Sequence, residues 1–535
     1  MPPHALDPVV TPDATTPDAA RPDAVAAPVD PAPGAGTPDV PRAGARQWLA
    51  LAVLMLPVLV VAIDNTVLSF ALPQISLALR PTGEQLLWIV DVYPLMLAGL
   101  LVTMGTLGDR VGRRLLLVVG AAGFGVVSLL AAFSTDAVHL VAARALLGVF
   151  GATLMPSTLS LLRNVFLDPG QRRLAIAIWA SGFSGGSVLG PVVGGWLLQH
   201  FSWGSVFLVN VPVVVVLLVA APLLLPESRN PRAGRLDPPS VVLSVVAMLP
   251  LVFGIKHVAS HGVDVLGTAA VAVGITMAVV FVRRQRRLDA PLLDVSLFAR
   301  PVFSASVGAN FTASFAIAGL VLFLSQHLQL VVGLDPVRAG LALLPGAVAS
   351  IAAGLLAVRL ARSLPLWVLV PGGMLLAVAG YALGTALGSD HRSGVVVAAF
   401  ALVGAGVGLA ETLTNDAILG SVPPQRAGAA SGISETAYEL GASLGVAVLG
   451  SVLAAVYRAD LVLPAGLTDA QRAAADQTLG GAVGLADGLP PAVAEQVLTS
   501  ARDAFGHGVA VTSGLGAVVV GVVALAVGAV LRRHR

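Results

Sequence analysis

The chain has 535 residues, of which 56% are hydrophobic and 11% are charged, and its mean hydropathy is +0.89. Soluble domains carry about 25% charged residues, so the composition indicates a polytopic membrane protein and excludes a soluble enzyme, a nucleic-acid binder and a secreted domain. The formal net charge of +2 points to no particular partner. Because cysteine is absent, disulfides, zinc–thiolate sites and iron–sulfur clusters are excluded, and no metal site is predicted.

The first 46 residues are rich in Pro, Ala and Asp. This composition cannot bury a core and predicts a disordered tail. It lacks the basic and apolar regions of a signal peptide, so the apolar run from Trp48 is predicted to be a true span. A span needs about 20 apolar residues, and fourteen segments qualify: 48–72, 86–107, 114–133, 138–161, 174–198, 205–225, 239–257, 265–282, 302–330, 338–358, 366–388, 394–420, 428–456 and 508–531.

The basic residues predict the orientation, because cytoplasmic loops carry an excess of Arg and Lys. With the N-terminus inside, 23 basic residues fall on the inside, 7 on the outside and one, Arg144, within a span. This asymmetry predicts an even number of spans with both termini cytoplasmic. The long connection 458–507 is then external, and TDAQRAAADQ and PPAVAEQVLTSARDA within it predict short amphipathic helices.

Two carboxylates lie in or near the first two spans. Asp64 follows the apolar start of span 1, and Asp91 lies early in span 2. Intramembrane ionisable groups are functional candidates, since a desolvated carboxylate can exchange protons and can balance a cationic substrate. The alternatives are a neutral, hydrogen-bonded Asp64 or a partner of Arg144, and an interfacial position for Asp91.

The loop between spans 2 and 3 reads GTLGDRVGRR, with Gly105, Asp109, Arg110, Gly112, Arg113 and Arg114. Its glycines permit a tight turn between closely packed helices. Asp109 is predicted to cap the next helix and to pair with the arginines. A basic hairpin loop would explain the arginines but not the whole spacing.

Span 4 places Arg144 inside the membrane, which costs about 2.5–3.5 kcal/mol on the insertion scale. This residue must therefore face protein or water. It is predicted to bind backbone carbonyls that pin span 4 to span 1.

Span 5 carries a glycine at every fourth position. Gly182, Gly186, Gly190 and Gly194 form a smooth face that a neighbouring helix can approach closely, and Gly195 adjoins it. Pro191 predicts a kink because it lacks a backbone donor. Tight helix packing alone is one interpretation of this pattern.

Spans 12 and 13 add three glutamates. Glu435 and Glu439 are four residues apart, so they lie on one helix face and at least one should bind a proton or a cation. Tyr438 supplies an aromatic face for a cation. The alternative is a capping pair of Ser434 and Glu435 at the helix entry. Glu411 lies within span 12, and Asp416 is predicted to be interfacial.

These stretches together resemble the major facilitator superfamily, and within it the fourteen-span drug:proton antiporters of the QacA-like and LfrA-like kind, which export quaternary ammonium compounds. The stretches that carry the resemblance are DNTVLSFALPQI, QLLWIVDVY, AGLLVTMGTLGDRVGRR, GPVVGG, WGSVFLVNVP and SETAYELGASLGVAVLGS. The resemblance implies a gating latch at the Asp109 loop, an antiporter element in span 5, and proton or cation sites at Asp64, Asp91, Arg144, Glu435 and Glu439. Some such pumps carry an extra acid in span 10, where this chain has Ser350.

The resemblance also implies an all-α fold of two six-helix bundles, 47–225 and 301–535, separated by two inserted helices within 226–300. The predicted function is proton-coupled export of hydrophobic, monocationic drugs by a monomer in the cytoplasmic membrane, without a cofactor. Asp91, Glu411, Glu435 and Tyr438 are the predicted substrate contacts. The rivals are a dedicated exporter of an endogenous antibiotic, an uptake symporter, and a membrane enzyme or sensor.

Overall fold

A computed structural model describes residues 42–81, 83–229, 237–289, 291–334, 336–387 and 393–534. The chain divides into residues 1–41 and a unit of residues 42–535. The predicted disordered tail therefore lies outside the described residues up to residue 41. Its last residues do not belong to a tail, because helix α1 (Ala45–Leu79) begins at Ala45.

The first half of the large unit is helical throughout. Acidic side chains begin two of its helices: Asp136 accepts from the His139 amide and Asp168 from the Gln171 amide, which satisfies donors that a helix start leaves unpaired. The predicted sixth span is divided, because Pro212 has no amide hydrogen for the carbonyl one turn earlier. After α1 the helices are α2 (Gly83–Val111), α3 (Arg113–Ala132), α4 (Ala137–Val165), α5 (Pro169–His200), α6 (Ser205–Leu208) and α7 (Asn210–Leu224).

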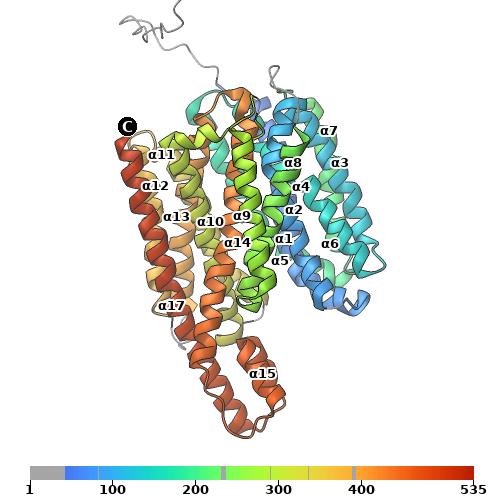
Figure 1. Ribbon diagram of the computed structural model, residues 1–535, viewed down its shortest axis with the longest axis vertical. Coiled ribbons are helices and arrows are strands. Elements are labelled where there is room, and N and C mark those ends of the chain that lie inside the picture. Colours follow the sequence, from blue (N-terminus) through green and yellow to red (C-terminus); the bar gives the residue numbers. More distant parts are fainter. Residues whose placement is uncertain are drawn as a thin grey trace, which may run out of the picture. The chain divides into compact units, whose positions relative to one another are not determined.

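The second half repeats this helical build (Figure 1). A short 3-10 turn precedes its first long helix, and that helix ends in a π-helical turn. The elements are η1 (Val295–Ala299), α10 (Pro301–Gln326), η2 (His327–Val331), α11 (Pro336–Leu360), α12 (Leu366–Gly384), α13 (Ser393–Gly420), η3 (Pro424–Arg426), α14 (Ala427–Asp460), α15 (Asp469–Gln477), α16 (Leu479–Ala486) and α17 (Pro491–Arg533). The described residues contain no strand, as the all-α prediction requires.

Each half has its own apolar core. One buried cluster is built from α1 to α7 around side chains such as Phe124 and Trp179. The other is built from α10 to α17 around Phe323 and Tyr381. The first cluster also includes Leu419 and Ala427 from the second half, so the two cores meet where the halves contact each other.

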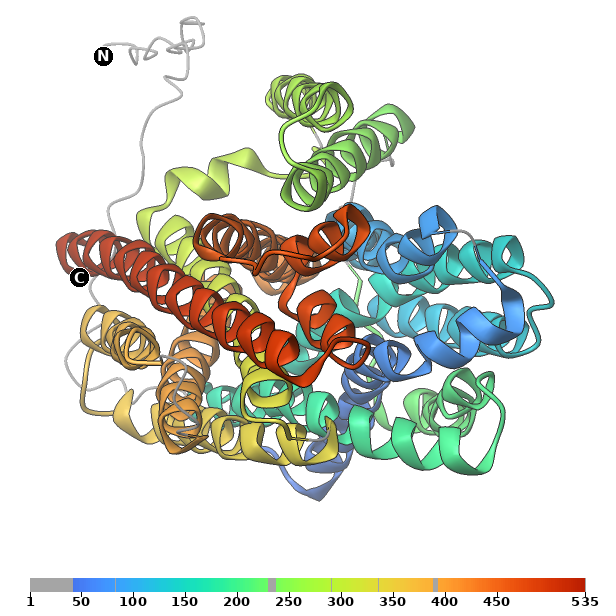
Figure 2. The same cartoon turned by 90° about the horizontal axis from the view of Figure 1, so that it is seen from below.

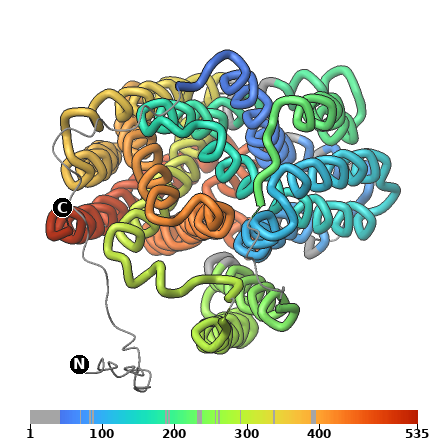
Figure 3. Tube along the Cα trace, turned by 90° about the horizontal axis from the view of Figure 1, so that it is seen from above, coloured from blue at the N-terminus to red at the C-terminus, as the bar shows by residue number. Residues whose placement is uncertain are grey.

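The two inserted helices, α8 (Pro238–His261) and α9 (Val265–Gln285), pack on each other beside the bundles (Figures 2 and 3). Helix α8 contacts both α2 and α14, and a 2.9 Å hydrogen bond joins the hydroxyls of Thr103 and Ser244. Beyond the spans, Arg284 binds Asp237 at 2.8 Å. The hydrogen bonds from Arg284 and then Ser240 lower the pKa of Asp237 to about 2, so this pair stays charged at physiological pH.

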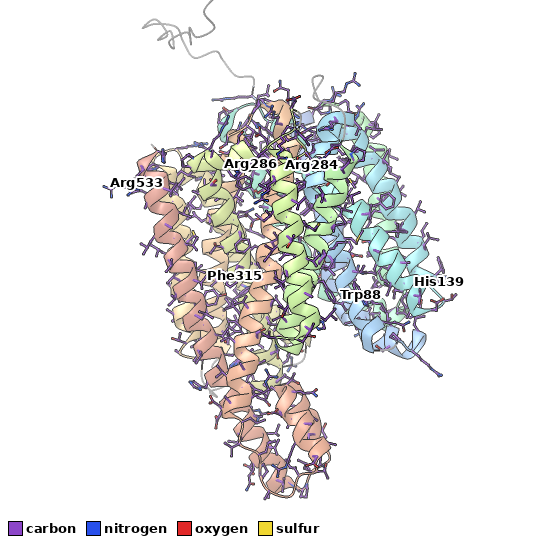
Figure 4. The ribbon with its side chains drawn as sticks, in the orientation of Figure 1. Trp88, His139, Arg284, Arg286, Phe315 and Arg533 are labelled. Atoms are coloured by element: carbon purple, nitrogen blue, oxygen red, sulfur yellow. The ribbon has the colours of Figure 1, made fainter. Side chains whose placement is uncertain are left out.

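Arginines gather at one end of the bundle, where Figure 4 places Arg284, Arg286 and Arg533. We call it the arginine-rich end. The connection after α14 projects from the opposite end (Figure 1). There Thr468 caps α15, as the amphipathic pattern predicts. The second predicted amphipathic helix is instead the start of α17, which runs unbroken from Pro491 to Arg533, so the last helix begins well before residue 508.

Thirteen helical segments of the described chain are long and apolar enough to cross a membrane. The one predicted span that is missing from this set is α5. Its glycines and serines lower its hydropathy, and it packs along α1 and against α11 and α13. The set of predicted spans is therefore matched by helices throughout, with α5 sheltered by protein on several sides.

Candidate functional site

A buried ion pair lies in the first bundle. The Arg144 guanidinium of α4 binds the Asp64 carboxylate of α1 at 2.6 Å, and each side chain is 1% exposed. Asn210 of α7 donates to the other Asp64 oxygen at 3.3 Å and to Ser128 at 3.4 Å. A charge pair without access to water is stable only with such additional hydrogen bonds. The interpretation of Asp64 as a partner of Arg144 is therefore correct.

The predicted anchoring of Arg144 needs one correction. Its Nε donates to the Ile89 carbonyl at 3.1 Å, but Ile89 belongs to α2. The link to α1 runs through the Asp64 carboxylate and not through backbone carbonyls. Arg144 thus joins α1, α2 and α4, because its long side chain offers several donors in a fixed geometry. The described residues include the backbone of Asp91 in α2 but not its side chain, so its predicted role lies outside them.

A cavity of about 290 Å³ lies between the two halves. Helix α14 lines one wall with Tyr438 and Glu439. Phe183 of α5 lies opposite, with its ring centroid 5.6 Å from that of Tyr438. The remaining lining residues are Ala62, Asn65, Thr66, Pro94, Ala442, Ser443 and Val446. Aromatic faces and one carboxylate suit a flat, apolar cation.

The three glutamates differ in their access to this cavity. Glu439 is half-buried and lines it, whereas Glu435 is 5% exposed and Glu411 is 9% exposed, and neither lines it. Both buried acids lie close enough to interact electrostatically. Glu435 is not a helix-entry cap, because α14 begins at Ala427, two turns earlier. The predicted substrate contacts Glu411 and Glu435 thus do not line the cavity.

Ser350 lies away from the cavity. It is 8% exposed in α11, and its backbone carbonyl touches Gly408 of α13. A carboxylate at this position would enter a helix–helix contact. The cavity geometry therefore gives no support to a link between Ser350 and the export of dications.

The glycines of α5 allow α1 to approach closely. A Cβ atom on Gly182, Gly186, Gly190 or Gly194 would collide with side chains of α1, from Met55 to Val67. No atom lies within 4 Å of a Cβ on Gly195, so that glycine does not serve this contact. Pro191 lies in α5, but its side chain is outside the described residues.

Gly190→Ala is expected to disrupt the protein because the new methyl group would overlap the Thr66 hydroxyl. Overpacking of this kind typically costs about 1–3 kcal/mol, and Thr66 lines the cavity. Export activity and the melting temperature of the purified protein should both fall. Gly195→Ala is the matched control and should leave both unchanged. Equal behaviour of the two variants would contradict this account of α5.

Asp109 joins the two halves at the arginine-rich end. Its carboxylate accepts two hydrogen bonds from Arg113, at 2.6 and 2.9 Å, and the backbone amides of Gly428 and Ala429 donate to it at 2.9 Å each. Gly105 allows this contact, because a Cβ there would collide with the Gly428 carbonyl. Asp109 therefore caps α14 of the other half, where the positive helix end favours a carboxylate.

The prediction that Asp109 caps the next helix is thus wrong. Glu227 does so instead, because the Arg114 and Leu115 amides each donate to its carboxylate at 3.1 Å. A Cβ on Gly112, whose φ is +120°, would approach this carboxylate to 2.8 Å. Arg110 ends α2 half-buried. No pattern in the sequence connects Glu227 with the loop.

Three further arginines cross between the halves at the same end. Arg163 of α4 donates to the carbonyls of Leu419 and Val422. Arg172 and Arg173 of α5 each bind Asp416 of α13 at 2.8 Å, so Asp416 lies near a helix end, as predicted. Together with Asp109, these contacts hold the halves together at the arginine-rich end.

Sequence reasoning did not identify Asn210 or Phe183 as site residues. It grouped Glu439 with Glu435 and did not predict that Glu439 alone lines the cavity. The NVP stretch that contains Asn210 carries no charge. Phe183 lies among the glycines of span 5, which were interpreted as a helix-packing face. A polar side chain within an apolar span was the available signal for Asn210.

Comparison with known proteins identifies the family. The Major Facilitator Superfamily profile matches residues 54–446. The chain is 52% identical to the multidrug efflux pump LfrA of Mycolicibacterium smegmatis, over 93% of this chain and 99% of that protein. It is 38% identical to the methyl viologen resistance protein SmvA of Salmonella typhimurium, over 88% and 95%. The human organic anion transporter MFSD10 shares the fold, with a TM-score of 0.58 at 15% identity over 89% and 99%. The chain belongs to the Major Facilitator Superfamily.

Proposed function

We propose that the protein is a proton-coupled antiporter that exports hydrophobic cations, including drugs and antiseptics, across the cytoplasmic membrane. The observation that carries this proposal is the cavity between the halves, where Phe183, Tyr438 and Glu439 combine aromatic surface with a carboxylate. Substrate sites of such transporters lie near the midplane between the halves. The 52% identity to a multidrug efflux pump supports the same activity.

The proposed cycle couples this cavity to the Asp64–Arg144 pair. A proton that enters from outside converts the Asp64 carboxylate to the acid, and its release inside restores the ion pair. The membrane potential supplies about 2.3 kcal/mol per charge per 100 mV. The protein needs no bound cofactor for this exchange, no enzymatic step is included, and one chain is sufficient because both halves of the cavity come from it.

The arginine-rich end is proposed to face the cytoplasm, with both termini on that side. The supporting observation is the excess of basic residues there, which follows the rule that positive loops stay inside. The contacts of Asp109, Arg163, Arg172 and Arg173 then close the cytoplasmic side. The projecting connection with α15 is external.

The proposed substrate charge rests on Glu439, the one carboxylate among the described residues that line the cavity. A lipophilic monocation gains from Glu439 in a low dielectric, so monocations are the proposed main substrates. Methyl viologen carries two positive charges, and the relative named for resistance to it is 38% identical to this chain. Dications are therefore included among the compounds in the transport test.

The proposal is tested with everted membrane vesicles that contain the wild-type chain. An imposed pH gradient should drive the uptake of ethidium, and a protonophore should abolish it. A panel of monocations, dications and neutral drugs then defines the range. Transport of one natural product alone would favour a dedicated exporter, and no gradient-driven transport of any compound would overturn the proposal.

Glu439→Gln should lower monocation export about tenfold and leave neutral substrates nearly unchanged, because the substitution removes the carboxylate on the cavity wall and keeps its size. Glu435→Gln, one turn away and buried, should weaken monocation export less. Vesicle uptake with matched charged and neutral compounds measures both. Recognition must rest on shape and apolar area if both variants treat charged and neutral compounds alike.

A further inference from the structure

Tyr93 contacts the buried ion pair and precedes a residue that lines the cavity. It is fully buried in α2, and the guanidinium carbon of Arg144 lies 4.5 Å from its ring centroid. Its hydroxyl makes no hydrogen bond within the described chain. The next residue, Pro94, lines the cavity. Tyr93 therefore contacts the ion pair through its aromatic face.

This face matters most when the ion pair is broken. While Asp64 is charged, it neutralises Arg144. When Asp64 takes up a proton, the guanidinium stays charged and buried, which is costly without a partner. The Ile89 carbonyl and the Tyr93 ring then still contact the guanidinium. A cation over an aromatic face gains more when it is desolvated, so the ring stabilises the protonated state more than the paired state.

We propose that Tyr93 is a positioning residue for proton coupling, whose ring holds the Arg144 guanidinium while Asp64 is protonated. This inference rests on the proposed proton-coupled function. Among the side chains that the structure describes, the groups that face the pair are Asn210 of α7, Ser128 of α3 and, at longer range, Glu439 of α14. Asn210 and Ser128 do not titrate, so among these neighbours only Glu439 can change charge with Asp64 in the working pH range.

The test measures the pH at which drug/proton exchange in vesicles is half-maximal. Tyr93→Phe keeps the ring and should match the wild type. Tyr93→Leu removes the ring, makes protonation of Asp64 less favourable and should move the midpoint about one pH unit lower, a tenfold loss of proton affinity. Pentafluorophenylalanine at position 93 keeps the ring's shape but reverses the charge of its face, and should shift the midpoint in the same direction. This isosteric variant preserves the test if the leucine variant does not fold.

Tyr381 provides the matched control. It is also fully buried, lies in the other bundle, and donates its hydroxyl to the Ala316 carbonyl at 2.6 Å. Tyr381→Phe should lower the melting temperature without moving the pH midpoint. A lower rate with an unshifted midpoint in both ring-altered variants would overturn the inference, as would a shift in Tyr93→Phe. Export driven by a pH gradient in Asp64→Asn would instead disprove the proposed coupling itself.

Discussion

Asp64→Asn is expected to abolish export driven by a pH gradient. Asparagine keeps the size of the side chain and can still accept hydrogen bonds, but it cannot cycle a proton. It also leaves Arg144, which is 1% exposed, without its counter-charge. Removal of one partner from a buried pair costs about 3–5 kcal/mol, so the melting temperature should fall as well. Ethidium uptake in everted vesicles measures the loss of coupling.

Loss of stability must be separated from loss of coupling in this variant. Asn210→Ala removes a neutral neighbour of the same carboxylate and should reduce stability while some gradient-driven export persists. Drug binding to purified Asp64→Asn, measured by fluorescence, should also persist because the cavity is intact. Wild-type rates of gradient-driven export by Asp64→Asn would exclude Asp64 from the coupling step.

Asp109→Asn is expected to slow transport about 30-fold without changing which compounds are transported. The substitution removes the charge that binds Arg113 and weakens the bonds from the α14 amides. Charge-assisted hydrogen bonds contribute about 1.5–3 kcal/mol each, so the closed arginine-rich end becomes less populated. The cavity residues are untouched. Rates and KM values for several drugs in vesicles should show a fall in kcat at constant KM.

The control for Asp109 is another acidic cap. Asp168 begins α5 through the Gln171 amide within one half of the protein. Asp168→Asn should leave transport rates close to those of the wild type, because asparagine is also a good N-cap. If Asp109→Asn loses some drugs and keeps others, the loop takes part in recognition and is not only a contact between the halves.

Much of the fold was predictable because most spans have a clearly apolar composition. Apolar runs between arginine-rich loops gave the helices, and glycines at every fourth position gave the α1–α5 contact. The start of α17 was harder to predict. The PPAVAEQ stretch is polar, so hydropathy begins the last span at residue 508, yet nothing in this stretch prevents the helix from beginning at Pro491.

The site was predictable where a charge stands in an apolar span. Asp64, Arg144, Glu411 and Glu435 were found on this ground, and all four are buried. Their partners were harder to find, because pairing depends on contacts across the chain. Asp109 binds amides some 319 and 320 residues away, and an amide leaves no mark in the sequence. Contacts across the chain likewise decide that Glu439 lines the cavity and that Glu435, one turn earlier in the helix, is buried.

Two arginines at the arginine-rich end bind the backbone of the other half. Arg113 donates to the Pro424 carbonyl, and Arg163 donates to those of Leu419 and Val422. Every residue type offers a carbonyl, so side chains at these receiving positions are free to vary during evolution while the contact persists. Pairwise covariation between homologous sequences should therefore fail to detect this interface, although the arginines themselves stay constrained. The Asp416 contact with Arg172 and Arg173 is the exception and should covary.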